Sequence, residues 1–239
     1  LDLNIIELKN KKDYIIGNKI SIKCIKSSGY DSALLVNIDG KKIFNLNDYP
    51  LNNKKDISIF KNNFGSCDVL LTQFSYAAWK GGKDNKTWRA NAANEKIQTL
   101  IDQAEILEAK TVIPFASFIK FSNKRNSYLN NDRNTPNVIR ERTKNTNFNV
   151  VFLKPNEIQN LNFLHQNKDS LKFWEEKISK SDSNDLIVYK NQYSIDELNI
   201  SFSKYRKRIF DKNSYYFLYF IKLIPFIKAF KKVILKVEN

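Results

Sequence analysis

Apolar and polar residues alternate through much of the first fifty positions, and this period of two predicts β-strands. The alternation is clear over 20–24, and a second apolar run covers 33–38. That run ends at Asp39-Gly40, a dipeptide typical of two-residue hairpin turns, and the run 42–47 follows it. The sequence therefore predicts an antiparallel β-hairpin with another strand before it.

The pattern then changes. Residues 68–72 form a short apolar run without alternation, which is typical of a strand covered on both faces. Apolar residues at helical spacing predict a helix over 91–110, and 111–115 is expected to form another strand. Strand, helix and strand in this order form a βαβ unit, which places its two strands parallel in one sheet. We therefore predict a layered α/β fold.

The second half of the chain has a mixed pattern that predicts a C-terminal α+β extension. Residues 120–147 are polar and rich in turn residues, so this segment is either a binding loop or loosely ordered. We expect strands at 150–153 and 231–237 and helices at 168–180, 195–210 and 213–223. The predicted domains are 1–154 and a mostly helical extension, 155–239.

The most apolar part of the chain is 215–227. Lysine residues within and after it keep it well short of the ~20 apolar residues that a membrane-spanning helix needs. It is either a core helix that ends near Pro225 or an interfacial helix, since aromatic and Lys side chains suit a membrane surface.

Composition limits the classes of site and partner. The chain carries 40 Lys and Arg against 25 Asp and Glu, a net charge of +15, which is a first indication of nucleic acid or anionic lipid. Only seven of the basic residues are Arg, the residue that nucleic-acid readers favour, so nucleic acid is not the expected partner. Cys24, Cys67 and His165 are the only residues of their types, which excludes a disulfide framework and a multi-histidine metal centre built from this chain alone.

Candidate chemistry lies where strands end, because α/β sheets bind ligands beyond the carboxyl ends of their strands. Asp48 follows a predicted strand and is a candidate metal ligand, with Asn45 and Asn47 shaping its pocket. Spacing alone favours the alternative that Asp48 caps the turn before Pro50. The next predicted strand is followed by a polar loop at 73–76, which is a second candidate.

Several short segments resemble a known superfamily. The residues Asp31-Ser32 and Asn45-x-Asn47-Asp48, together with Ile113-Pro-Phe, resemble the second half of a metallo-β-lactamase-fold domain. Over about 15–137 the chain more closely resembles the β-lactamase-like part of CMP-N-acetylneuraminate hydroxylases and their bacterial relatives. This resemblance implies a partial αββα sandwich with its site at the strand ends of one edge.

The resemblance also implies a metal. Asp48 would be a ligand for zinc or iron in a full-length parent, but the superfamily's His-x-His-x-Asp-His cluster is not in this chain. Where many members place a last histidine, this chain has Ala116-Ser117. We therefore expect a C-terminal portion with a missing N-terminal segment, inactive by itself because a catalytic zinc needs three or more protein ligands.

The loop after 111–115 carries the residues expected to face a substrate, namely Ser117, Ser122, Asn123 and Arg125. Basic residues there favour a small anionic substrate, such as a nucleotide sugar or a phosphate ester. Solvated surface charge is an equal alternative for Arg125.

The sequence is compatible with three functions. The parent is a metal-dependent hydrolase or a nucleotide-sugar-related enzyme similar to CMP-sialate hydroxylases; or the domain is a catalytically degenerate binding or scaffolding module; or the chain is a peripheral membrane protein. No signal peptide is visible, so the expected location is the cytoplasm.

Overall fold

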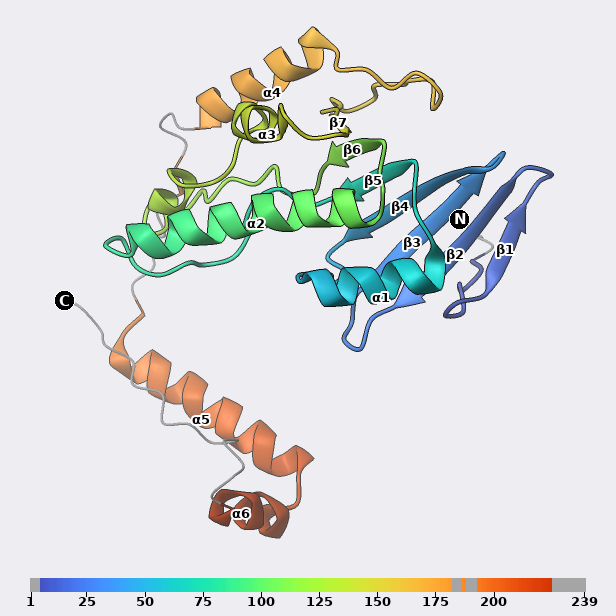
Figure 1. Cartoon of the computed structure of the whole chain (residues 1–239). Coiled ribbons are helices and arrows are strands. Elements are labelled where there is room, and N and C mark those ends of the chain that lie inside the picture. Colours follow the sequence, from blue (N-terminus) through green and yellow to red (C-terminus); the bar gives the residue numbers. More distant parts are fainter. Residues whose placement is uncertain (1–4, 182–185, 188–192, 225–239) are drawn as a thin grey trace. The chain divides into compact units, whose positions relative to one another are not determined.

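The computed structural model describes residues 5–181, 186–187 and 193–224. The chain divides into two compact units, 1–188 and 189–239 (Figure 1). Helix α4 (Lys168–Ser181) belongs to the first unit, because its Leu171 and Trp174 pack into the hydrophobic core of that unit. Part of the predicted C-terminal extension therefore folds with the first domain.

The first unit is built on a seven-stranded sheet whose strands lie side by side in sequence order (Figure 1). Strands β1 to β4 are antiparallel, and β4 to β7 are parallel. The parallel half brings the carboxyl ends of β4, β5 and β6 to one edge of the sheet. The strands are β1 (Asp13–Ile16), β2 (Ile20–Lys26), β3 (Ser32–Ile38), β4 (Lys41–Asn47), β5 (Val69–Thr72), β6 (Thr111–Pro114) and β7 (Asn149–Val150).

The predicted hairpin is confirmed. Asp39 and Gly40 both have positive φ, 52° and 85°, as a type I′ turn requires. The turn sets the register in which Leu35 lies opposite Phe44. The βαβ prediction is also confirmed, because β5 and β6 are parallel and α2 (Lys86–Ile106) connects them.

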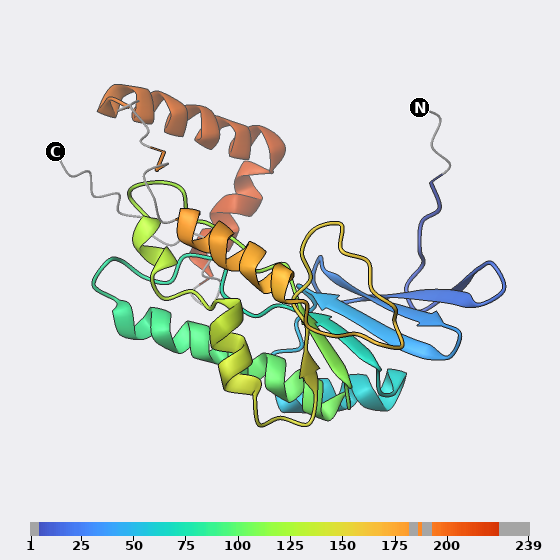
Figure 2. The same ribbon diagram turned by 90° about the horizontal axis from the view of Figure 1, so that it is seen from above.

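One face of the sheet carries the core. Helices α1 (Lys54–Phe64) and α2 run along this face (Figures 1 and 2). They bury apolar side chains against those of the strands, including Ile57, Phe60, Ile97 and Leu100 against Phe44, Leu46, Leu70 and Val112. The alternate residues of β2 to β4, Ile22, Leu34, Val36 and Ile43, are only half-buried on the opposite face.

Two helices were missing from the sequence prediction. Helix α1 is capped by Asn53, whose side chain accepts a hydrogen bond from the Asp56 amide. Helix α3 (Pro136–Thr143) lies inside the segment expected to be a loop, capped by Thr135 and opened by proline at its first position. The segment 120–147 is thus partly helical, with a further 3₁₀ turn η1 (Ser127–Asn130).

The α/β class is confirmed, and the residues that the structure describes form one sheet. The second unit contains α5 (Ile195–Lys212) and α6 (Tyr215–Leu223). The core-helix interpretation is wrong for α6, which buries none of its residues. The predicted strand 231–237 lies outside the described residues. Within the described part, no helix is both long and apolar enough to cross a membrane.

Candidate functional site

A polar pocket of about 310 Å³ lies at the carboxyl ends of β4 and β5. Asp48 follows β4, Gln73 follows β5, and Lys96 comes from α2, which covers this edge. Asp31 joins them because β3 runs antiparallel to β4, so that the start of β3 lies beside the end of β4. We call this cavity the strand-end pocket.

A bulge in β4 shapes the pocket. The pairing of β4 with β5 shifts register between Asn45 and Asn47, and Asn47 has φ of 42°. Asparagine tolerates this left-handed conformation better than most residues do. Asp48, directly after the bulge, is exposed at the rim of the pocket.

A chain of hydrogen bonds fixes the polar groups. The Gln73 amide donates to Asp48 Oδ1, and the Lys96 ammonium donates to Gln73 Oε1 over 2.8 Å. The Asn47 amide donates to Asp48 Oδ2 over 3.4 Å. Gln73 is thus held between a carboxylate and an ammonium, which fixes the orientation of its amide.

Two buried residues support this arrangement. Thr72 Oγ1 donates to Gln103 Oε1 over 2.6 Å, and the Gln103 amide donates to the Leu51 carbonyl over 2.8 Å. Both polar side chains are 3% exposed. A buried polar group is tolerated when it is hydrogen-bonded, so these bonds fix α2 against the ends of the strands.

Burial raises the pKa of the Tyr49 hydroxyl in the pocket wall, and the second perturbed titratable group there is Lys96. Burial lowers the pKa of its ammonium, the nearby Lys80 lowers it further, and Asp48 acts in the opposite direction. The charged form is therefore less stable in the folded protein than in water.

This shift predicts how stability depends on pH. Between the lowered folded pKa and the unfolded pKa of lysine, the unfolded chain binds more protons, so the free energy of unfolding rises with pH. We expect Lys96→Met to flatten this rise in urea titrations between pH 7 and 10. Lys55→Met, at an exposed position of α1, should keep the wild-type slope. An unchanged slope in Lys96→Met would contradict the assignment.

Of the three site residues that the sequence predicts around the end of β4, two line the strand-end pocket and one does not. Asn47 and Asp48 line the strand-end pocket. Asn45 lies inside β4, and its Oδ1 is buried without a hydrogen-bond partner among the described residues. It does not line the pocket, so it shapes the site at most through the bulge that follows it.

The residues predicted to face a substrate lie outside the strand-end pocket. Ser117 is buried, accepts a hydrogen bond from the Phe74 amide over 3.1 Å, and lines a separate cavity of about 100 Å³. Ser122 and Asn123 are half-buried beside Ile187. Arg125 is exposed, and its amide donates to the Asn123 side chain.

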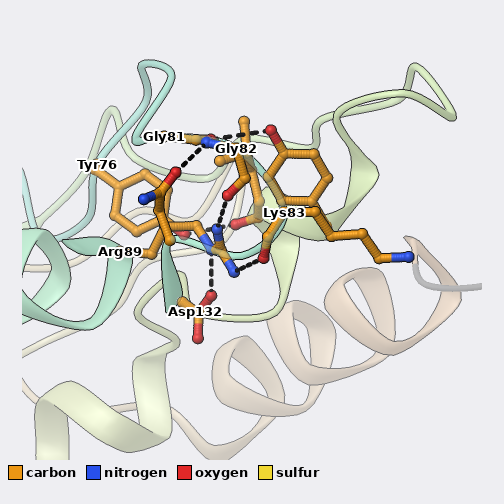
Figure 3. Close-up of polar contacts among 9 residues, drawn as sticks. Tyr76, Gly81, Gly82, Lys83, Arg89 and Asp132 are labelled. Atoms are coloured by element: carbon orange, nitrogen blue, oxygen red, sulfur yellow. Dashed lines mark hydrogen bonds and ion pairs between the residues drawn. The ribbon is translucent and has the colours of Figure 1, made fainter. Parts of the chain in front are cut away.

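A buried arginine orders the loops around this end of the fold (Figure 3). Arg89 is 2% exposed and pairs with Asp132 at 2.6 Å. It also donates to the carbonyls of Gly82 at 2.7 Å and Lys83 at 3.1 Å. Tyr128 lies under the guanidinium, with 5.1 Å to its ring centroid. The polar segment 120–147 is therefore tied to α2 through Asp132 and Tyr128.

Lys96 was not among the residues singled out from the sequence. A signal for it exists, because Lys96 and Gln103 are seven residues apart on the side of α2 that also carries the buried Leu100. A polar residue at such a core-facing position has a polar partner or lines a cavity. Lys96 meets both conditions, because it donates to Gln73 and lines the strand-end pocket.

The side chains that line the strand-end pocket limit which metal centre it could form. Asp31 and Asp48 supply the carboxylates with which the pocket could contact a metal. Among the described residues, no three His, Cys, Asp or Glu side chains come together. These residues do not fit a complete zinc or iron centre, which needs three or more protein ligands.

Comparisons with known proteins give a distant likeness. No family model matches the chain, and no curated protein matches it. Among solved structures, the chain is similar to the E377D mutant of CmlA β-hydroxylase, with a TM-score of 0.40 and 10% identity. The match covers 64% of this chain and 33% of that one, so this chain spans about a third of its length.

Proposed function

We propose that the strand-end pocket binds a small anionic ligand through Lys96. The observation that carries this proposal is the position of a half-buried ammonium in the pocket wall, beside a second lysine. Burial and Lys80 both disfavour its charge, and a bound anion would offset both effects. An ammonium has three N–H donors, of which Gln73 accepts one.

The dimensions favour a compact ligand. A volume of about 310 Å³ is at the small end of the range for ligand pockets. The polar side chains around Lys96, among them Asn47 and Thr99, offer hydrogen bonds to a sugar or a phosphate ester. A phosphate ester, or the phosphate part of a nucleotide sugar, is the ligand class that this chemistry supports best.

The proposal predicts ligand binding that depends on Lys96. We expect inorganic phosphate and cytidine monophosphate to bind the wild-type chain, measured by isothermal titration calorimetry at low ionic strength. Lys96→Met should weaken binding at least about tenfold, because a hydrogen bond to a charged group contributes about 1.5–3 kcal/mol. Lys55→Met removes the same charge from an exposed site and should leave affinity unchanged. Equal affinity in the two variants would refute the proposal.

Metal-dependent catalysis in a longer protein is the second candidate. Asp31 and Asp48 share one pocket, which favours it, and the half-buried second face of the sheet suits a partial αββα sandwich of metallo-β-lactamase type. In such a longer protein, the remaining ligands for zinc or iron would come from residues outside this chain. Without them, the domain would act as a binding module.

Metal analysis separates these two roles. In a longer protein that carries a histidine cluster, elemental analysis should find zinc or iron, and Asp48→Asn should remove at least part of it. Asp39→Asn, at the exposed hairpin turn, serves as the matched control. Metal content that is unaffected by Asp48→Asn would leave Asp48 as the carboxylate held by Gln73, with no part in metal binding.

A further inference from the structure

We propose that helices α5 and α6 bind an anionic lipid surface in the plane of its headgroups. Both helices leave all their side chains unburied. Such exposure is unusual for aromatic residues, and here it extends over two consecutive helices. In α6 the exposed fractions reach 86% at Tyr216 and 62% at Phe220. The proposal concerns the second unit and is independent of the strand-end pocket.

The helices have defined ends of their own. Ser194 and Glu197 form a capping box, in which the Glu197 amide donates to Ser194 Oγ over 3.1 Å and the Ser194 amide donates to Glu197 Oε2 over 2.8 Å. Ser214 caps α6 in the same manner, by accepting from the Phe217 amide. Local caps therefore stabilise two helices that bury no core.

Helix α5 separates apolar and acidic residues. An apolar stripe recurs at helical spacing and consists of Ile195, Leu198, Phe202, Tyr205 and Ile209. At 3.6 residues per turn, the acidic residues Asp196, Glu197 and Asp211 fall on the opposite side of the helix. Arg206 and Lys212 fall along the two edges of the stripe, while Lys204 and Lys207 share the far side with the acids. An apolar stripe edged by basic residues is the arrangement of an interfacial membrane helix.

The positive charge of this region favours anionic lipid as the binding partner of the two helices. From 212 to 237 the sequence contains six Lys and no Asp or Glu. A second copy of the chain would bring like charges together at the edges of the stripe, whereas anionic lipid complements them. The aromatic side chains of α6, such as Tyr215, Phe217 and Tyr219, suit the boundary between headgroups and acyl chains. Because α5 carries charges along its length, it would lie on a bilayer without crossing it.

Vesicle flotation with the full chain tests the proposal. We expect binding to phosphatidylcholine vesicles that contain one quarter phosphatidylglycerol, weaker binding to pure phosphatidylcholine, and loss of binding as salt rises. Arg206→Gln and Lys212→Gln should each weaken binding to the anionic vesicles about fivefold.

Because the whole chain is basic, an apolar variant is needed to exclude simple charge attraction. The double variant F217S/F220S keeps every charge and should weaken binding at least about tenfold, since two phenylalanine side chains no longer enter the interface. The matched control, I158S/F163S, removes exposed apolar side chains from the first unit and should bind as the wild type does. Equal binding of the two double variants would overturn the proposal.

Hydrogen exchange gives a second readout. On binding vesicles, the amides of 195–223 should exchange more slowly, with no change across the sheet of the first unit. Protection confined to the first unit would overturn the proposal. A chain that ignores vesicles but forms a dimer sensitive to F217S/F220S would also overturn it, and would show that a second copy covers this surface.

Discussion

Replacing Arg89 with methionine is expected to lower the free energy of unfolding by about 3 kcal/mol, which would make it one of the most destabilising single changes in the chain. The guanidinium is 2% exposed and satisfies one carboxylate and two backbone carbonyls. Methionine fills much of the same space but offers no N–H donor, so Asp132 and the two carbonyls lose the partner that the buried Arg89 side chain supplies. Urea denaturation followed by circular dichroism measures the change.

Two comparisons make this prediction specific. Arg142 is exposed and bonds the Asn94 side chain, so Arg142→Met should change stability by no more than about 0.5 kcal/mol. Asp132→Asn keeps an acceptor for Arg89. Its loss in the free energy of unfolding should therefore lie between the losses of Arg89→Met and Arg142→Met. If Arg89→Met and Arg142→Met were equally mild, the buried ion pair would not be what holds the segment 120–147 in place.

Replacing Trp174 with alanine is expected to destabilise the first unit by about 3 kcal/mol. The indole stacks on Phe118 with 3.5 Å between ring centroids and an interplanar angle of 10°, and its N–H donates to the Leu153 carbonyl over 2.9 Å. Removing it leaves a cavity between α4 and the end of the sheet and an unpaired carbonyl. Thermal or urea unfolding would report the loss.

Trp88 provides the matched control, since it is 48% exposed and its ring contacts that of Trp79 edge to face. Trp88→Ala should cost less than about 1 kcal/mol. Because Trp174 lies beyond the boundary that the sequence suggested at 154, a large effect would show that the first unit needs α4 for stability. Equal effects in the two variants would mean that α4 is a peripheral addition.

The sequence predicts the central part of the sheet well, because the signals there are local. The Asp39-Gly40 turn and the βαβ pattern each depend on residues close together in the chain. Helix α1 could also have been found, since Ile57, Phe60 and Phe64 have helical spacing behind an Asn cap. Helix α3 is only eight residues long, which gives too few apolar positions for a clear period.

The site is predicted less completely, because it depends on contacts distant in sequence. The strand-end rule identifies Asp48 and the loop that contains Gln73. Lys96 comes from the crossover helix, and no local pattern shows that it reaches Gln73. The sequence prediction groups three residues of the loop after β6 with the site, namely Ser122, Asn123 and Arg125. This grouping requires the loop to fold over the pocket, whereas the structure places Ser122 and Asn123 beside Ile187.

The mixed sheet also orders events during synthesis. Strands β2, β3 and β4 are joined by short turns, so they can pair as soon as about the first fifty residues leave the ribosome. The parallel strand β6 must wait for the whole of α2, because a long crossover has to close before the pairing compensates for the lost chain entropy. During that interval α1 can already cover part of the core face of the early hairpin, but the part that α2 covers is still open. This nascent chain, more than the finished protein, is therefore the state in which chaperone contact would matter most.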